Sequence, residues 1–315
     1  MFKRFILIKI VHRKDINEKK WEQLNASSEH PYFTSIYYLD ATCKNWRALV
    51  LGDYEACFPF YVKKFLFFEI ITHPLFIRTF STIGNTYCHE QFLTFLKEKY
   101  LFVYVFTDNL SSEVEGILKK RKYQKLTFLP QYEEHWSNYA QNAKRQITKF
   151  EKSTAEIKHI NALEDFEMYI DFFYAQKKGE FEQITRKKLN VVGNIASNAA
   201  KQNKLQLIEA RDNGTLLAFG FFIVENDKAL YLKGIVNEAG KTIGAMYAVF
   251  DAFIKKNHNT LRSLDFGGSD SKGLSEFNLK FGAEHNYYIN LTSNRLSFPL
   301  NRWMNLRYKL NENTD

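Results

Sequence analysis

Short apolar runs separated by polar turns recur along the chain and alternate with stretches of helical spacing. Gly52 and Asp53 form a polar turn between the apolar runs 46–51 and 54–62, which is the pattern of a β-hairpin. The pattern returns in the second half, where the turn at 212–214 separates two further apolar runs. In both halves helical sequence precedes the hairpin, and more strands with an intervening helix follow it. The repeat predicts two α+β domains of the same plan.

The remaining elements follow from apolar spacing and from capping residues. We expect strands at 2–11, 46–51, 54–62, within 69–83, and at 101–106, 204–211, 215–224, 229–236, 263–266 and 285–290. We expect helices at 15–24, 35–42, 91–99, 111–121, 138–153, 164–178, 187–202, 242–256 and 274–281, with 128–136 as strand or loop. The domains are then residues 1–137 and 138–315, and the alternative is two unrelated α+β domains.

Composition fits a globular protein of 315 residues. Apolar residues make up 45% and charged residues 25%, which excludes a mainly disordered chain. Cys43, Cys57 and Cys88 are too few and too scattered for a disulfide framework, so we expect small core residues in a reducing compartment. The histidines show no metal-ligand spacing, and we expect no metal. With neither an export signal nor a spanning segment, we expect a cytoplasmic protein.

Basic residues outnumber acidic ones, 44 to 35, which gives a net charge of +9. The excess is either a solvated surface or a field that steers an anionic partner, such as tRNA, a nucleotide-linked substrate, coenzyme A or acidic lipid. Arg145 and Lys149 share a helix face, with Lys144 beside them, and are candidates for phosphate contacts. Residues 300–310 are basic and amphipathic, so they either rest on an acidic membrane surface or pack against their own domain.

The segment 229–247 carries the clearest candidate site. A strand ends at Val236, a loop spans 237–240, and a helix opens at Lys241. The first amides of a helix lack intrahelical partners, and glycines let phosphates approach the backbone, so a pyrophosphate fits there. The alternative is that the glycines serve a turn and close helix packing. The candidate anion-binding residues are Val236, Asn237, Gly240, Lys241, Thr242, Gly244 and Ala245.

Three stretches resemble known families. Lys241-x-x-Gly244-Ala245 resembles the acyl-coenzyme A loop of the GNAT acetyltransferase superfamily, with Lys where Arg or Gln is usual and Met246 at a position that is usually small. Residues 264–283 resemble the "Asp-Phe-x-Gly-Ser … Phe-x-x-x-Phe-Gly-Ala" stretch of the Fem-type aminoacyl transferases. Residues 142–149 are similar to the basic helix that opens the second domain of that group.

The resemblance implies an α+β fold of two GNAT-like domains in tandem, each a mixed twisted sheet flanked by helices. It implies an N-acyltransferase or aminoacyltransferase that acts on an amine by direct attack, with a coenzyme A thioester or aminoacyl-tRNA as the donor. One alternative is an acyl-coenzyme A-dependent N-acetyltransferase of a small amine or amino sugar. The other is a catalytically silent binding protein on the same scaffold. The oligomeric state stays open.

Acyl transfer to an amine needs a group that binds or deprotonates the amine, an acyl donor held in position, and stabilisation of the oxyanion. Asp265, at a strand end before two glycines, is the candidate that binds or deprotonates the amine, or else it caps its own turn. Glu209 is a candidate general base through water, or a solvent-facing strand residue. Tyr247 either protonates the leaving group or packs in the core. Lys233 contacts a phosphate or forms a cross-strand surface pair.

Overall fold

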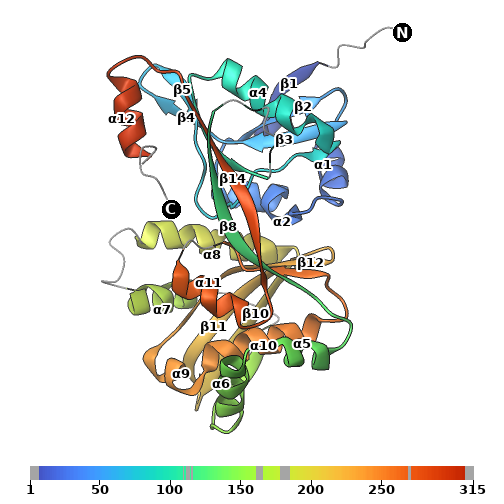
Figure 1. Cartoon of the computed structure of the whole chain (residues 1–315), viewed down its shortest axis with the longest axis vertical. Coiled ribbons are helices and arrows are strands. Elements are labelled where there is room, and N and C mark those ends of the chain that lie inside the picture. Colours follow the sequence, from blue (N-terminus) through green and yellow to red (C-terminus); the bar gives the residue numbers. More distant parts are fainter. Residues whose placement is uncertain are drawn as a thin grey trace. The chain divides into compact units, whose positions relative to one another are not determined.

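The computed structural model describes residues 7–108, 110, 114, 116–160, 166–177, 185–268 and 271–308. It divides into two compact units, the first formed by Met1–Arg121 with Tyr287–Asp315 and the second by Lys122–Asn286. This division differs from the expected one at residue 137. The reason is that strand β14 (Glu284–Asn294) continues into the first unit, where Ile289 pairs with Thr107 of strand β7 (Phe102–Thr107) (Figure 1).

The first unit contains two groups of strands. β1 (Ile8–His12), β2 (Arg47–Leu51), β3 (Ala56–Phe60) and β6 (Ile83–Gly84) form one sheet, and β4 (Val62–Phe65), β5 (Phe68–Ile71), β7 and β14 follow one another in the second. Its helices are α1 (Glu18–Asn25), α2 (Pro31–Thr34), α3 (Ile36–Thr42), α4 (His89–Lys99) and α12 (Leu300–Arg307).

The hairpin predicted around Gly52 is confirmed, since Leu49 pairs with Phe58 across it. The three cysteines are buried and free, as expected of core residues.

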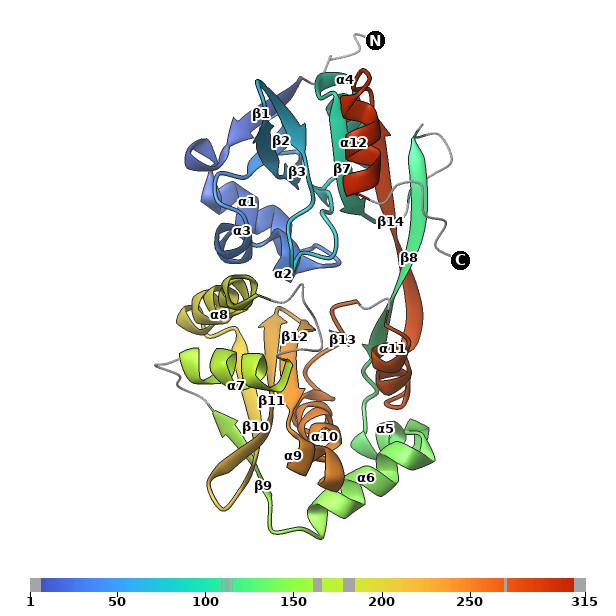
Figure 2. The same cartoon turned by 90° about the vertical axis from the view of Figure 1, so that its left-hand side faces the viewer.

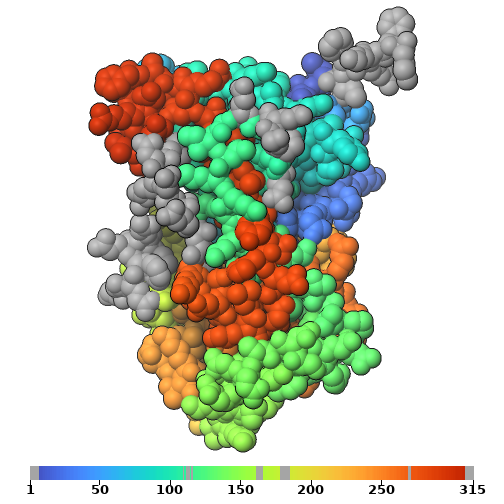
Figure 3. All heavy atoms as spheres, viewed as in Figure 1, coloured from blue at the N-terminus to red at the C-terminus, as the bar shows by residue number. Residues whose placement is uncertain are grey.

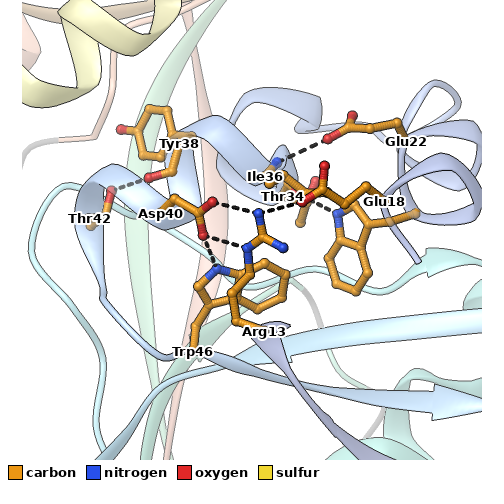
Figure 4. Close-up of polar contacts among 10 residues, drawn as sticks. Arg13, Glu18, Glu22, Thr34, Ile36, Tyr38, Asp40, Thr42 and Trp46 are labelled. Atoms are coloured by element: carbon orange, nitrogen blue, oxygen red, sulfur yellow. Dashed lines mark hydrogen bonds and ion pairs between the residues drawn. The ribbon is translucent and has the colours of Figure 1, made fainter. Parts of the chain in front are cut away.

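A polar cluster joins the first strand of this unit to its helices (Figure 4). The guanidinium of Arg13 donates to both carboxylate oxygens of Asp40, at 2.7 and 2.8 Å, and the indole Nε1 of Trp46 donates to Asp40 at 2.8 Å. The hydrogen bonds to Asp40 raise the pKa of Arg13. Helix α1 is capped by Asn17, whereas Asp15, where the helix was expected to begin, lies in a 3-10 turn just before it.

The second unit holds a six-stranded run in the order β8-β13-β12-β11-β10-β9. The strands are β8 (Ile117–Thr127), β9 (Glu156–Ile160), β10 (Leu205–Asp212), β11 (Thr215–Glu225), β12 (Lys228–Val236) and β13 (Ser263–Asp265). The helices are α5 (Tyr132–Asn138), α6 (Gln141–Glu151), α7 (Glu167–Lys177), α8 (Arg186–Lys201), α9 (Glu238–Ile243), α10 (Ala245–Asn257) and α11 (Lys272–Leu279). Neighbouring strands are antiparallel except β12 and β13, which are parallel.

Helices cover both faces of this sheet (Figure 2). Ile208 and Ala210 of β10 belong to a core cluster with residues of α6 and α10. Glu209, between them, contacts Tyr169 of α7. Because alternate residues of a strand point to opposite faces, α6 and α10 cover one face and α7 the other. None of the helices in the described part of the chain has the length and apolar sequence needed to cross a bilayer.

Two sequence predictions are wrong in this region. The helix expected at 111–121 is contradicted from residue 117 onward, where strand β8 begins, and residues 111–113 and 115 lie outside the described part. Lys and Arg favour a helix there, but β8 lies between β14 and β13 in the sheet, and strand pairing holds the chain extended. The segment 128–136 was expected to be strand or loop, but its residues from Tyr132 onward belong to helix α5.

Candidate active site

Strands β12 and β13 form a fork in the second unit. They pair only from Lys228–Ser263 to Leu230–Asp265, whereas β12 stays paired with β11 as far as Val236. From Tyr231 onward, therefore, the edge of β12 that faces β13 has no strand partner among the described residues. Backbone N–H and C=O groups on such an edge can pair with an extended ligand chain.

A β-bulge lies just beyond the fork. Tyr231 pairs with Phe222 and Lys233 with Phe221, so Leu232 is an extra residue in β12. Gly234 follows in the same strand, and it lies so close to β11 that an added Cβ would be 2.2 Å from the carbonyl oxygen of Phe219. Bulges re-aim side chains and occur next to active sites more often than chance predicts. Local strand geometry therefore changes where the open edge begins.

Asp265 is buried at the fork itself. It is the last residue of β13 and lies opposite Leu230, at the final paired position. Its Oδ1 accepts a hydrogen bond of 2.9 Å from the backbone N–H of Gly267, which has a φ of 82° that favours glycine. The turn-capping contact that was one reading of Asp265 is thus present. Its reading as the amine-binding carboxylate stays a prediction.

Glu209 is a buried residue, with 1% of its surface exposed, so the solvent-facing alternative is wrong. Its carboxylate accepts from Tyr169 Oη at 2.5 Å, from Arg211 Nε at 2.7 Å and from Arg211 Nη2 at 3.0 Å. Burial, with the bond to Glu209, raises the pKa of Tyr169, and the bond to Glu209 raises the pKa of Arg211. These contacts fasten helix α7 to the sheet.

Glu209 and Asp265 are too far apart to serve one reacting centre. Along the pairing, Glu209 is level with Phe219 and Ile235, while Asp265 is level with Leu230. Three strand spacings of about 4.8 Å and five residues of about 3.3 Å separate them, which is roughly 20 Å. Of the two carboxylates, Asp265 alone stands at the fork.

The predicted anion-binding segment forms two helices rather than a loop and one helix. Asn237 caps α9 by accepting from Gly240 N at 2.7 Å, so the helix begins at Glu238 and not at Lys241. The expected loop at 237–240 is wrong because this cap starts the helix directly after β12. Gly244, with a φ of 81°, ends α9, and α10 then begins with no side-chain cap.

Both glycines of this segment are closely packed. A Cβ on Gly244 would lie 2.4 Å from the carbonyl oxygen of Gln146 in α6, and one on Gly240 would lie 2.9 Å from that of Leu217. Close packing, the alternative reading, is therefore present at both. Lys241 is half exposed and its Nζ lies 2.5 Å from Glu238 Oε1. Beside it, Thr242 donates to the backbone of Glu238 and Ala245 is buried.

Helix α6 packs against the start of α10 through Gln146 and carries basic side chains. Arg145 and Lys149 are exposed, and no ion pair joins them to a carboxylate of the described residues. Arg145 Nη2 donates to Asn142 at 3.0 Å, and Lys144 Nζ donates to the carbonyl of Ser137 at 3.0 Å. Figure 3 shows α5 and α6, in light green, as a continuous surface below the orange-red segment that contains α11. These cations are available to an external anion.

Tyr247 and Lys233 lie on opposite faces of the sheet. Tyr247, in the first turn of α10, packs on Phe277 and Phe281, and its hydroxyl accepts from Lys280 Nζ at 3.2 Å. Lys233 pairs with Phe221 on the α7 side, where its Nζ lies 5.3 Å from the ring centroid of Phe173. Desolvation there lowers the pKa of Lys233. Lys233 is therefore not part of the segment at the start of α10.

Sequence reasoning missed the partners of Glu209 and Tyr247. Arg211 could have been found, because residues two apart on a strand share a face and opposite charges there attract. The bulge at Leu232 and the bond from Lys280 to Tyr247 depend on tertiary pairing and have no local signal.

The acetyltransferase (GNAT) domain family matches residues 137–277, which include the fork, α9 and α10. The matched segment, which is less than half of the chain, is similar to a GNAT domain. The superfamily resemblance found in the sequence is thus confirmed, and with it a general acyl-transfer character for the domain. No curated protein sequence is significantly similar to the chain.

Solved structures extend the likeness beyond the GNAT domain. FemX is 11% identical with a TM-score of 0.64, covering 94% of this chain and 99% of its own. L-PGS from Bacillus licheniformis is 11% identical with a TM-score of 0.55, covering 92% and 95%. A tandem GNAT protein from the clavulanic acid biosynthesis pathway is 10% identical with a TM-score of 0.50, covering 91% and 98%. The likeness is one of fold, and it confirms two GNAT-like domains in tandem.

Proposed function

We propose that the chain is an N-acyltransferase or aminoacyltransferase whose donor lies along the open edge of β12. The observation that carries the proposal is the continuity of three features. The unpaired edge of β12 runs to Val236, the short helix α9 leads from there to the α9–α10 junction, and α6, whose Arg145 and Lys149 are exposed, packs against that junction through Gln146 at Gly244. An extended arm that ends in phosphates fits this sequence of surfaces.

Coenzyme A has such an arm, and the residues present fit it in part. The backbone from Tyr231 to Val236 would hold the amide-bearing arm, and the uncapped start of α10 with Arg145 and Lys149 would hold the phosphates. When bound, the coenzyme supplies an acyl group activated as a thioester. Aminoacyl-tRNA, which supplies an ester and many phosphates, fits the α6 cations as well. Both donors therefore stay in the proposal.

Two side chains of the GNAT-like segment carry the proton transfers, one as the acceptor and one as the donor. Asp265, buried at the fork, binds the acceptor amine and takes the proton that the amine loses on attack. Tyr247, paired with Lys280, delivers a proton to the leaving group. Positioning the two reactants can lower the barrier by about 7–11 kcal/mol, so no nucleophilic side chain is needed. Glu209 holds α7 in place and does not touch the reacting atoms.

Two observations favour a second candidate, the catalytically silent binding protein. Gln146 packs against Gly244, and Lys241 is paired with Glu238, so neither the glycine nor the lysine faces an open loop. Such a site would hold a nucleotide weakly. An N-acetyltransferase of a small amine or amino sugar requires strong coenzyme A binding and is less favoured on the same grounds.

A thermal-shift panel separates the candidates. Acetyl-coenzyme A, longer acyl-coenzyme A species, a charged tRNA pool and nucleotide-linked cell-wall precursors are each added to the full chain. A ligand at 100 times its Kd stabilises the fold by about 2.7 kcal/mol. We expect a shift with at least one donor, lost in Arg145→Gln/Lys149→Gln but kept in the exposed control Lys272→Gln.

For tRNA, each cation lost should also flatten the slope of log affinity against log salt by about 0.7–0.9. A shift with donor and no transfer to any amine would support the silent scaffold. No shift with any donor would remove the transferase proposal.

A further inference from the structure

The β4–β5 hairpin and helix α12 of the first unit present four large apolar side chains to solvent. Exposed fractions are 66% for Leu66, 90% for Phe67, 43% for Trp303 and 67% for Leu306. Most large apolar side chains of a soluble domain are buried, and a local group of exposed ones marks an interaction site. We call this group the hairpin–helix surface.

The two parts of this surface are fixed to one another. The ring of Phe65 stacks on that of Trp303 with centroids 5.2 Å apart. Below them, Leu300, Met304 and Tyr308 of the α12 segment pack on a cluster that includes Ile70 and Phe102. Because residues three and four apart lie on one helix face, Trp303 flanks this inner stripe and is partly covered by Phe65, whereas Leu306 faces outward. Figure 1 shows α12, in red, beside β4 and β5.

Leu66 occupies an unusual backbone conformation at the tip of the hairpin. Its φ is 54°, in the left-handed region where turns prefer Gly or Asn. A leucine in that position costs conformational energy. Burial of its side chain does not offset this cost, because the side chain is exposed. The residue is thus better explained by contact with something outside the chain than by folding.

Cations accompany the apolar side chains, and Glu69, the carboxylate opposite Lys64 in the hairpin, is paired with Arg47. Residues 62–68 contain Lys63 and Lys64, residues 296–308 contain Arg302 and Arg307, and neither of these two stretches has an Asp or Glu. All four cations are exposed, and none forms an ion pair with a carboxylate of the described residues. Arg307 instead lies over the ring of Trp303, 5.0 Å from its centroid.

We propose that the hairpin–helix surface docks on an anionic lipid bilayer. Apolar and Trp side chains enter the interface, while Lys and Arg remain at the level of the lipid headgroups. A second copy of the chain is a poorer occupant, since a two-fold contact would set these cations against the same cations of the other copy. A nucleic acid would meet the cations but leave Leu66 and Phe67 in water. This inference does not depend on the proposed transferase activity.

Vesicle flotation with the full chain tests the proposal. We expect binding to vesicles of phosphatidylglycerol and phosphatidylcholine and none to phosphatidylcholine alone. Phe67→Glu/Leu306→Glu should lower the partition coefficient at least tenfold, and Leu274→Glu, at an exposed leucine of the second unit, should not. Lys64→Gln/Arg302→Gln should lower it about 25-fold, since each cation near an anionic surface contributes about fivefold.

Trp303 provides a second readout. Trp21 and Trp46 are fully buried, and the partly exposed Trp136 belongs to α5 of the second unit. A blue shift of emission on adding anionic vesicles that is present in wild type and lost in Trp303→Phe, which keeps the ring stack, therefore reports on Trp303. The thermal transition of each variant checks that it folds. The proposal is overturned if the wild-type chain does not bind anionic vesicles, or if Phe67→Glu/Leu306→Glu binds them as strongly as wild type does. It is also overturned if the wild-type chain forms dimers without lipid and this double variant abolishes them.

Discussion

Glu209 and Arg211 lie two residues apart on β10 and share two hydrogen bonds, Nε to Oε2 at 2.7 Å and Nη2 to Oε1 at 3.0 Å. Glu209 is fully buried, while Arg211 reaches the sheet edge and also donates to the carbonyl of Gly214. Tyr169 of α7 donates to the same carboxylate. One charged pair thus ties together a strand, its turn and the helix above it.

Removing the cation from this pair should be costly. Arg211→Met leaves a buried carboxylate without its counter-charge, and we expect the free energy of unfolding to fall by about 3 kcal/mol. Urea denaturation measures the loss. Lys158→Met, which removes an exposed cation from the paired position on β9, should change stability by less than about 0.5 kcal/mol. Adding Glu209→Gln to Arg211→Met should restore at least half of the loss. If the two single variants behave alike, the pair does not stabilise the fold.

Gly244 should tolerate no side chain, for two separable reasons. Its φ of 81° strains any L-residue, and a Cβ would lie 2.4 Å from Gln146 O. Gly214 has the same φ but nothing within 4 Å of its would-be Cβ. We therefore expect Gly214→Ala to cost about 1 kcal/mol of unfolding free energy, and Gly244→Ala to cost about 1–3 kcal/mol more, because α6 must move. Equal losses in the two variants would mean that α6 does not rest on Gly244.

Stability should fall as the solution becomes acidic. His73 is packed between Phe80 and Phe106, and desolvation lowers its pKa to about 3, well below the ordinary value near 6.5. Between pH 6.5 and pH 3, His73 therefore binds a proton in the unfolded chain but not in the folded chain. Acidification through this range favours the unfolded chain, so the stability that His73 contributes is complete only above pH 6.5. Burial lowers the pKa values of His89 and His135 as well, which acts in the same direction.

Urea unfolding at pH 7.5 and pH 5.5 checks this expectation for His73. Its share of the loss is about 1.4 kcal/mol, one pKa unit below the unfolded value. His73→Gln should show a loss smaller by that amount, whereas the exposed His285→Gln should keep the wild-type difference. A His73→Gln variant with the full wild-type loss would contradict the assignment.

The sequence predicted elements whose signals are local. Gly52-Asp53 between apolar runs was sufficient for the β2–β3 hairpin, and the apolar spacing of 164–178 for helix α7. Strand β8 was missed because its lysines favour a helix and its extended form depends on β13, more than a hundred residues away. Within the candidate site, the position of Asp265 at a strand end before glycines could be predicted. The packing of Gly244 could not, because it depends on Gln146 of a distant helix. Contacts between distant segments are the part that spacing cannot supply.

Asp265 offers the sharpest test of the proposed transfer, since its turn-capping and amine-binding roles can be separated. Asn has an oxygen in the place of Asp265 Oδ1 and can still accept the hydrogen bond of 2.9 Å from Gly267 N. Asp265→Asn should therefore keep the free energy of unfolding within about 1 kcal/mol of wild type. It removes the negative charge, and with it the means of binding an ammonium and taking its proton.

We therefore expect kcat/KM for transfer to an amine to fall by about 10²–10⁴, with donor binding in the thermal-shift assay unchanged. Glu209→Gln, the matched change at the carboxylate that does not reach the fork, should lose stability and keep most of its rate per folded molecule. An Asp265→Asn enzyme that transfers at the wild-type rate would reduce this residue to a turn cap and place the acceptor amine elsewhere in the domain.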